Sequence, residues 1–499
     1  MDIRNIPPEV LSLILGQLPE YQNDDDPESR LHYGHLRNAR LVCRQWNKLA
    51  TAHLFRTLTL EVGREYGVRS WKHKAWSEMV SSEAVQRVAQ SVVIYSHPED
   101  DELEMDDDAS DEEDSPIENS DDEDAGYFGA AVRRIVKLPN LKSLQICFAE
   151  NCLGDRDTEW WEDDEEIEPI SHRAQTLRTV FGALRKRRAA FDKDDQTTTI
   201  RSLTLKNLQN LPIPEFTSSD LYKDAVKDIN ELHLLITHEY REPGPDHDLD
   251  RIERQTFEPY LEKELLPPLA HQLRSLTLTF RECWGVMPAY FDGKGLVFPN
   301  LKTLTLGEFV IGHHDHFDWV LAQKSLETLR LDRCFIVSHI RILNHHWDTW
   351  RAHVSSHDWH EYPDGAFGFQ KIHDQAFGFS GTWEAVYDGI RNSLPKLREF
   401  GSVHHSYYNT FDRRESMGAS LSSYRYIAFE SGLCPSPWGE ARDDSGEMSF
   451  GNNDPAILPS DATDSARYSN NKSLNRAKET ELGDTRAFQD LLRAVRERG

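Results

Sequence analysis

The chain has 499 residues, and its 57 Lys and Arg stand against 85 Asp and Glu, which gives a formal net charge of -28. Only 38% of the residues are hydrophobic, so we expect part of the chain to lie outside any packed core. The sequence shows neither the basic face typical of nucleic-acid binding nor an apolar run of eighteen residues. We therefore expect neither a nucleic acid nor a membrane as a partner.

Most of the negative charge lies in two stretches. Residues 98–124 hold seventeen Asp or Glu and no Lys or Arg, and residues 155–168 hold nine acidic residues against Arg156. Because like charges repel and few apolar side chains are available, residues 98–124 are predicted to be a disordered acidic insertion. Three of its serines have an acidic residue three positions on, which suggests acid-directed phosphorylation, with an inert solubilising loop as the alternative: Ser110, Ser115 and Ser120.

The cysteines and the N-terminal residues indicate a compartment. The first residues, MDIRNIPPE, lack the basic segment and apolar run of a secretory signal, and the six cysteines form no C-x-x-C pair. Scattered cysteines of this kind are expected to be reduced thiols, most of them in the core. We therefore expect a cytoplasmic or nuclear protein, or one found in both.

Two helices are predicted within the first sixty residues. The first begins at Pro7-Pro8, since a first helical turn tolerates proline, and its apolar residues follow at helical spacing: Leu11, Ile14, Leu15 and Leu18, with Val10 and Leu13 beside them. The second covers residues 36–55 and has its apolar residues at Leu36, Ala39, Val42, Cys43, Trp46, Leu49 and Ala50. So small a pair of helices buries this surface poorly alone, which predicts a partner.

The segments IPPEVLSLILGQL and LRNARLVCRQWNKLATAHLFRTLTL resemble the F-box motif, including its proline-led first helix and its LVCRxW signature. The resemblance implies an F-box domain at residues 1–57 that docks on the Skp adaptor of Skp–cullin–F-box (SCF) ubiquitin ligases and, through it, on cullin. The positions that match the family's adaptor-facing pattern are Ile6, Pro7, Pro8, Val10, Leu11, Ile14, Leu15, Leu18, Leu41, Val42, Cys43 and Trp46.

One feature departs from the family. The connection between Leu18 and Leu36 is about a dozen residues longer than usual, although flexible insertions cost little loop-closure entropy. The alternative to an F-box is a generic helical hairpin that caps the next domain.

Beyond residue 57 the pattern apolar-x-x-Leu-x-Leu recurs. Its copies end at Leu60, Ile146, Leu205, Leu234, Leu278, Leu306 and Leu331, and LPKLREF, which ends at Phe400, resembles a last copy. The copy at Leu331 runs on to Cys334 as L-x-x-L-x-L-x-x-C, the strand signature of leucine-rich repeats. Alternation places the leucines on one side of a short strand, and stacking of the copies would bury them.

This repetition predicts an α/β fold. We expect an irregular leucine-rich-repeat solenoid over residues 58–434, with parallel strands inside and helices such as residues 172–191 and 257–266 outside; an ordinary α/β domain is the alternative. Residues 435–499 are predicted to be a mostly disordered polar tail with a possible terminal helix at 486–498, which would dock on the solenoid or a partner, or stay frayed.

Two further stretches have alternative interpretations. Residues 185–188, RKRR, suggest a nuclear address or, alternatively, the solvated end of an amphipathic helix. Residues 335–405 are rich in His, Trp, Phe and Gly, and five histidines crowd together: His345, His346, His353, His357 and His360. Zinc requires three or four converging ligands, so we expect no metal here, but either a recognition loop or packing beneath a long loop.

No catalytic motif was found. The sequence has no G-x-S-x-G, no P-loop, no G-x-G-x-x-G and no paired-cysteine metal motif. We expect a non-catalytic protein without a cofactor. The resemblance implies the substrate-recognition subunit of an SCF-type ubiquitin ligase, whose repeats bind a protein substrate of unknown identity. The alternative is a leucine-rich-repeat scaffold whose F-box binds the adaptor without ligase function.

Overall fold

The structure is a computed structural model, and it describes residues 6–18, 20–21, 31–60, 62–65, 68–71, 73–96, 126–152, 167–168, 170–192, 197–238, 252–287, 289–344, 347, 354, 357–363, 374–403, 418–422, 425–430, 441–442, 448–449 and 476–499. The acidic insertion with its three serines, His345, His346, His353 and residues 450–475 lie outside this set. The chain forms two compact units, Met1–Lys206 with Ser219–Asp228 and Asn207–Ser218 with Ile229–Gly499.

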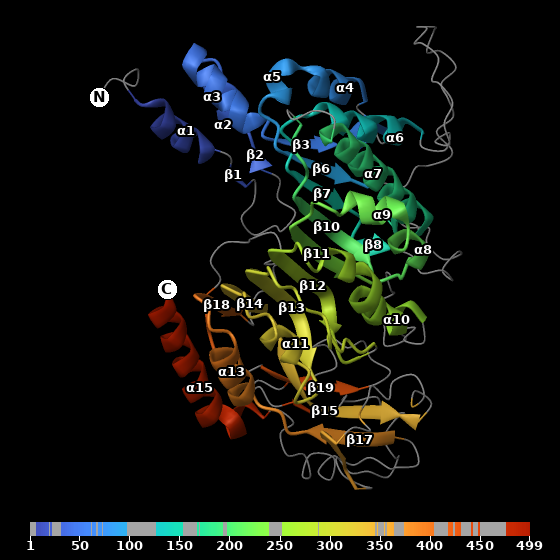
Figure 1. Cartoon of the computed structure of the whole chain (residues 1–499), viewed down its shortest axis with the longest axis vertical. Coiled ribbons are helices and arrows are strands. Elements are labelled where there is room, and N and C mark those ends of the chain that lie inside the picture. The colour runs from blue at the N-terminus through green and yellow to red at the C-terminus, as the bar shows by residue number, and fades with distance from the viewer. Residues whose placement is uncertain are drawn as a thin grey trace. The chain divides into compact units, whose positions relative to one another are not determined.

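The first unit begins with three helices: α1 (Pro8–Gly16), α2 (Gly34–Ala39) and α3 (Arg44–Leu54). Between α1 and α2 the strands β1 (Glu20–Tyr21) and β2 (Leu31–His32) pair antiparallel. The helices share a small core of Leu11, Leu15, Leu36, Ala39 and Ala50. This helical N-terminal region leads at once into the first strand of a sheet (Figure 1).

The sheet of the first unit is parallel. Its strands are β3 (Thr57–Leu60), β6 (Ser91–Tyr95), β7 (Ser143–Cys147) and β10 (Ser202–Gln209), and Leu58, Val92, Leu144 and Leu203 lie in one register. The leucine pattern predicted three of these strands but missed β6, because Val92 and Ile94 take the places of the two leucines. Both side chains are fully buried.

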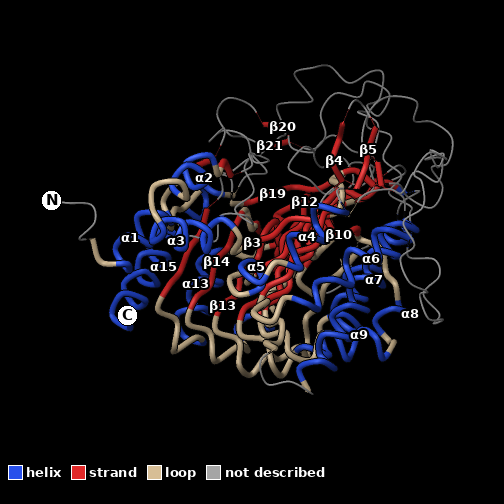
Figure 2. Tube along the Cα trace, turned by 90° about the horizontal axis from the view of Figure 1, so that it is seen from above, coloured by secondary structure: helices blue, strands red, loops and turns tan. Residues whose placement is uncertain are grey.

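Helices cover this sheet. They are α4 (His73–Ser81), α5 (Glu83–Gln86), α6 (Gly126–Arg133), the 3-10 turn Arg134–Lys137, α7 (Ile170–Phe191) and α9 (Asp220–Ala225). Helices α6, α7 and α9 lie together on one side of the strands (Figure 2). Two small pairs, β4 (Val62–Glu65) with β5 (Val68–Trp71) and β8 (Asn151–Cys152) with β9 (Ile167–Glu168), complete the unit.

The second unit repeats the parallel arrangement. Its strands β11 (Glu231–Thr237), β12 (Ser275–Trp284), β13 (Thr303–Ile311), β14 (Thr328–Asp332) and β18 (Glu399–Val403) pair in this order. Leu232, Leu276, Leu304, Leu329 and Phe400 form one continuous register row. Together the two units give the mixed α/β fold with a helical N-terminal region that the sequence predicts.

The helices of the second unit are α8 (Pro214–Thr217), α10 (Ile252–Tyr260) with a π-helical turn at Leu261–Leu265 and a 3-10 turn at Pro267–Leu269, α11 (Asp318–Leu321), α13 (Trp383–Ser393) and α15 (Ala477–Arg498). Helix α15 starts nine residues before the predicted terminal helix and packs against α13 (Figure 1). None of the helices that the structure describes combines the length and apolar character needed to cross a bilayer.

The segment rich in His and Trp extends the second sheet. Strand β15 (Phe335–Leu343) pairs antiparallel with β17 (Asp374–Phe379) and parallel with β19 (Tyr426–Glu430), and β16 (Trp359–Glu361) pairs with β17. The side chains of Trp359, Phe377 and Phe379 are buried. These three aromatic residues therefore pack within the fold. Residues 348–353 and 364–373 of the same stretch lie outside the described residues, and a recognition loop there stays a prediction. The pair β20 (Ala441–Arg442) and β21 (Met448–Ser449) follows.

The RKRR stretch is divided by exposure: Arg185 and Lys186 are exposed, whereas Arg187 is buried. Arg187 is only 1% exposed and donates to the carbonyl oxygens of Leu138 (2.6 Å), Thr198 (2.8 Å), Pro139 (3.1 Å), Leu141 (3.2 Å) and Ile135 (3.5 Å). Burial lowers the pKa of Arg187 to about 10. Its neighbours Arg185 and Arg188 pair with Asp224 and Asp228. Arg187 is thus a structural cation that satisfies the carbonyls at the end of the preceding helical segment.

Replacing Arg187 by Met should lower the free energy of unfolding by about 3 kcal/mol, because several buried carbonyls lose their donor at once. Arg185→Met is the matched control: Arg185 is 54% exposed in its ion pair, so its loss should cost less than about 1 kcal/mol. Urea unfolding followed by circular dichroism measures both. Equal effects of the two substitutions would contradict the structural role of Arg187.

Candidate functional site

The first helices expose a group of apolar side chains. Five of the eight large hydrophobic residues that are exposed within the described residues lie here: Val10 (45% exposed), Leu13 (71%), Ile14 (46%), Leu41 (85%) and Val42 (58%). We call these five residues the apolar surface. A small domain that leaves this much apolar area in water is suited to bury it against a partner.

Helix α1 is apolar on two sides. Pro8 occupies its first turn, where a missing N–H costs nothing, and Glu9 there complements the positive helix end. Leu11 and Leu15, four residues apart, face the core and are 1% and 0% exposed. Val10 and Leu13 lie outside the core, so one short helix both builds its own domain and presents apolar side chains to solvent.

Leu41 and Val42 are held by the turn between α2 and α3. The N–H groups of Leu41 and Val42 donate to the carbonyls of Asn38 (3.0 Å) and Ala39 (3.2 Å). Arg40 Nε donates to Asn47 Oδ1 at 3.2 Å, which ties the turn to α3. The apolar side chains at the tip of the turn are therefore fixed in position by their own backbone.

A polar contact joins α1 to α3 beside the small core. Ser12 Oγ lies 2.9 Å from His53 Nε2. Gly16 lies close to the same ring, since a Cβ built at this glycine would come 3.2 Å from His53 Cε1. This contact sets the distance between α1 and α3 at the end of α1.

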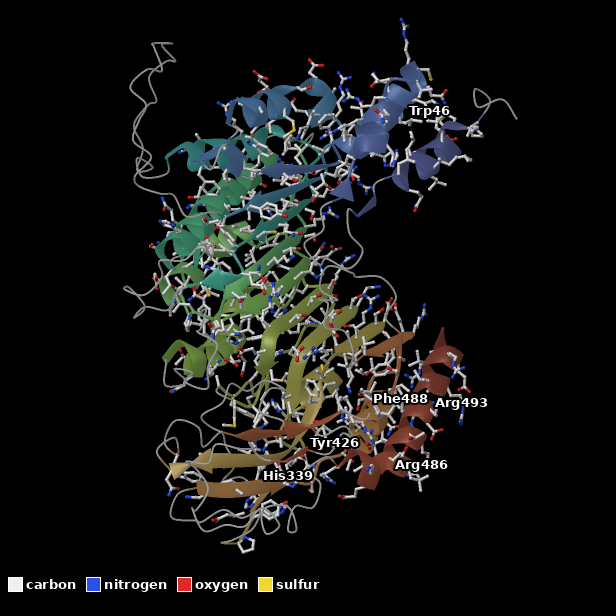
Figure 3. The ribbon with its side chains drawn as sticks, turned by 180° about the vertical axis from the view of Figure 1, so that it is seen from behind. Trp46, His339, Tyr426, Arg486, Phe488 and Arg493 are labelled. Carbon is white, nitrogen blue, oxygen red and sulfur yellow. The ribbon has the colours of Figure 1, made fainter. Side chains whose placement is uncertain are left out.

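The twelve residues predicted from the family pattern divide by exposure. Seven are exposed: Pro7, Pro8, Val10, Ile14, Leu41, Val42 and Cys43. Three are half-buried, Ile6, Leu18 and Trp46, the last of which is marked in Figure 3. Leu11 and Leu15 are buried in the small core, where they support the surface from beneath. Contact of these residues with an adaptor stays a prediction.

Leu13 was missed as a site residue. It is 71% exposed and lies three positions after Val10, so the helical spacing alone places it on the outer side of α1. The helical spacing was visible in the sequence, but the family pattern selects the neighbouring positions of α1 and not Leu13. Leu13 therefore belongs to the apolar surface.

The charges around the apolar surface are mostly positive. Arg37, Arg44 and Lys48 are exposed on α2 and α3, and Glu9 is the acidic residue of α1. An apolar centre with a basic rim favours a partner whose own rim is acidic, because opposite charges steer the encounter and reject wrong partners.

The comparison with protein families supports the interpretation of these helices. Residues 3–61 match the model for F-box-like domains. No curated protein matches the chain. The chain thus carries an F-box-like domain, which implies binding of a Skp-type adaptor in SCF-type complexes. F-box proteins are in general non-catalytic subunits. Within the described residues, no three His, Cys, Asp or Glu side chains are arranged to hold a metal ion.

A group of polar residues, called the polar cluster below, lies just after the leucines of strands β10, β13 and β14. Asn207, Glu308 and Arg333 have left-handed φ values of 58°, 61° and 50°, and each follows the second leucine of its copy by two positions. Arg333 Nε lies 2.5 Å from Glu308 Oε1, and Arg281 Nη2 donates to Asn207 Oδ1 at 2.8 Å. The polar pairs hold a backbone conformation that side chains other than glycine rarely adopt.

Two buried carboxyl groups belong to this cluster. Glu308 is 8% exposed and Asp332 is 6% exposed. Burial raises the pKa of Glu308 to about 8 and that of Asp332 to about 7, and the nearby Arg333 opposes both shifts. At neutral pH the cluster therefore holds protons that ordinary carboxyl groups have released.

These pKa shifts predict how stability depends on pH. The unfolded chain releases both protons near pH 4, whereas the folded protein keeps them until about pH 7 to 8, so the free energy of unfolding falls as pH rises between these values. Glu308→Gln should remove a slope of at most about 1.4 kcal/mol per pH unit.

The measurement is urea unfolding of the wild type and the variant at several pH values from 5 to 8. Glu327→Gln is the control, because the Glu327 side chain is 40% exposed and pairs with Lys302 at 2.8 Å, which lowers its pKa. That change should leave the slope between pH 5 and 8 as it is. Asp332 should keep part of the slope in Glu308→Gln, but a slope as steep as that of the wild type would show that Glu308 ionises normally.

Proposed function

We propose that the chain is the substrate-recognition subunit of an SCF-type ubiquitin ligase. The apolar surface of an F-box-like domain carries this proposal: five exposed hydrophobic residues lie on α1 and on the turn between α2 and α3, and these helices are already packed around their own core. Burial of the surface would provide the free energy for docking on a Skp-type adaptor, at roughly 25 cal/mol per Å² of apolar area. The same adaptor would connect the chain to cullin.

We further propose that both units are built from irregular leucine-rich repeats. The parallel strands, the rows of aligned leucines and the repeated left-handed bend support this interpretation. A strand whose leucines are buried by the next strand leaves its other residues and its bends available for contact with a ligand. On this proposal the repeats bind a protein substrate.

The chemistry of ubiquitin transfer would belong to the partner subunits. The chain would act by holding a substrate near the reactive centre, which raises the effective concentration of the reacting groups. This role requires no catalytic residue of its own, and it requires that substrate and adaptor bind at different places on the chain. The alternative remains a repeat scaffold that binds the adaptor without promoting ubiquitination.

Leu13→Asp combined with Leu41→Asp should weaken adaptor binding by at least about 100-fold, because two charges would have to enter an apolar interface. Both residues are exposed, so stability should change by less than about 0.5 kcal/mol for each. Calorimetric titration of the full chain with a recombinant Skp-type adaptor measures binding, and circular dichroism checks the fold.

Leu482→Asp is the control, since Leu482 is 87% exposed on α15 and lies outside the apolar surface. This variant should bind as the wild type does. Leu15→Asp would be a poor test, because Leu15 is buried in the small core and its replacement would unfold the helices. Unchanged binding of the Leu13 and Leu41 double variant would overturn the proposed docking.

The ligase and the scaffold make different predictions in cells. If the chain is a substrate receptor, adaptor and cullin should co-purify with the wild type, and a protein captured by the repeats should have a longer half-life when the double variant replaces the wild type. Pulse-chase measurement of the captured protein tests this. A scaffold would leave that half-life unchanged and would bring down the adaptor without cullin.

A further inference from the structure

The C-terminal helix α15 packs on the second unit through few large side chains. Of its 22 residues, Ala477, Asp484, Ala487, Phe488, Leu491 and Val495 are buried. The ring of Phe488 packs at a tilt against Tyr387 and edge-on against Phe400, with centroid distances of 5.3 and 6.4 Å. Figure 3 shows Phe488 on the inner side of α15 and Arg493 on its outer side. Burial of three large apolar residues offsets little of the conformational entropy that is lost when six turns of helix become ordered. The polar contacts therefore decide whether the helix stays docked.

Asp484 is the centre of these polar contacts. Its side chain is fully buried, and its carboxylate accepts hydrogen bonds from Thr480 Oγ1 (2.7 Å), Arg425 Nε (2.8 Å), the Glu384 N–H (2.8 Å) and Tyr426 Oη (3.0 Å). The Glu384 N–H belongs to the first turn of α13, so Asp484 caps a helix about one hundred residues away in sequence. A buried carboxylate is tolerated only when it is satisfied in this way.

The opposite end of α13 is capped by α15 as well. Arg498 donates from its two terminal nitrogens to the carbonyls of Leu394 (2.8 Å) and Arg391 (2.7 Å). Helix α15 therefore runs along α13 and satisfies backbone groups at both of its ends, which is the role of side-chain caps within a single helix. If α15 leaves, the Glu384 N–H and the carbonyls of Arg391 and Leu394 lose their partners together, while Thr382 still caps the Ala385 N–H.

One buried group opposes this docking. Tyr387 is fully buried against Phe488, and its hydroxyl has no hydrogen-bond partner among the described residues. Burial, together with the nearby carboxylate of Asp484, raises the pKa of Tyr387, so the hydroxyl stays neutral. A buried hydroxyl without a partner costs free energy that is recovered when water reaches it. The docked state thus carries a built-in penalty that the undocked state does not have.

We propose that α15 is a releasable strap, latched by Asp484, which covers the face of α13 and β18 formed by Trp383, Tyr387, Ile390 and Phe400. The strap opens as one unit while strands β11–β14 stay folded, because its polar contacts reach α13 and the segment Arg425–Tyr426, with Asp484 making the largest number of them. The occupant of this face is α15 itself. The proposal is independent of adaptor docking, since it concerns the second unit alone.

The test is native-state amide hydrogen exchange of the full chain, followed by mass spectrometry of peptides from α15, α13 and β11–β14. In the wild type, peptides of α15 should exchange faster than those of the strands. Asp484→Asn should speed exchange in α15 by about tenfold or more, because the four groups that donate to Asp484 lose their charged acceptor. The strands should not change.

Tyr387→Phe should have the opposite effect and slow exchange in α15 several-fold, because it removes the unpaired hydroxyl and keeps the ring contact. Asp490→Asn is the control: Asp490 pairs with Arg391 at 3.3 Å on the partly exposed side of the same interface, and its loss should change exchange less than about twofold.

The two opposite variants keep the proposal testable even if Asp484→Asn fails to fold. Exchange of α15 at the same rate as the strands in the wild type would overturn the separate opening of the strap. Equal acceleration of α15 and the strands in Asp484→Asn would show that Asp484 supports the whole unit and is not a latch. Faster exchange in Tyr387→Phe would remove the proposed penalty.

Discussion

The fold depends on one constraint, which is that a strand with leucines on one side cannot bury them without a neighbour. In the second unit the leucines of neighbouring strands bury one another, because each lies in register with the next: Leu232, Leu276, Leu304 and Leu329. A row of this kind has no natural end, and its last strand leaves an open edge. At β18 this edge is closed in two ways: Ser402 bonds to residues 418–420, and α15 lies against the last strand and its helix. The terminal helix therefore helps to cover the open edge that the row of leucines leaves at β18.

The F-box-like domain shows the opposite solution. Its helices are too short to bury all of their apolar residues, so α1 divides them between an inner and an outer side. Leu11 and Leu15 form the core that makes the domain a folded object, and Val10 and Leu13 are left for a partner. This division explains why a pattern based on family resemblance mixes two kinds of residue. Substitutions on the inner side change whether the domain folds, and those on the outer side change what it binds.

The sequence predicted the features that repeat and missed those that depend on long-range contacts. A local pattern predicted seven strands with leucines, and the degenerate last copy of that pattern ends in β18. Strand β6 was not predicted, because valine and isoleucine stand where the other copies have leucine. Helical spacing is local, so it predicted the apolar residues of α1, whereas Leu41 and Val42 lie in a turn that interrupts the predicted helix 36–55. The roles of Arg187 and Asp484 could not: one side chain meets carbonyls 46 to 52 residues away, and the other meets a helix end 100 residues away. Nothing in the neighbouring sequence distinguishes a buried arginine in RKRR from an exposed one.

Arg187 and Asp484 also show where the fold uses charge in place of apolar area. Each is almost fully buried, and each satisfies backbone groups at the end of a helical segment; at α13, Asp484 does so in addition to the N-cap Thr382. The segments between the strands differ in length, so their helix ends have no common residue that could cap them. A carboxylate or guanidinium that reaches several groups at once closes such an end with a single side chain. When that side chain is replaced, all of these backbone groups lose their partner together. At α15, the docking of the whole helix therefore depends on the carboxylate of Asp484.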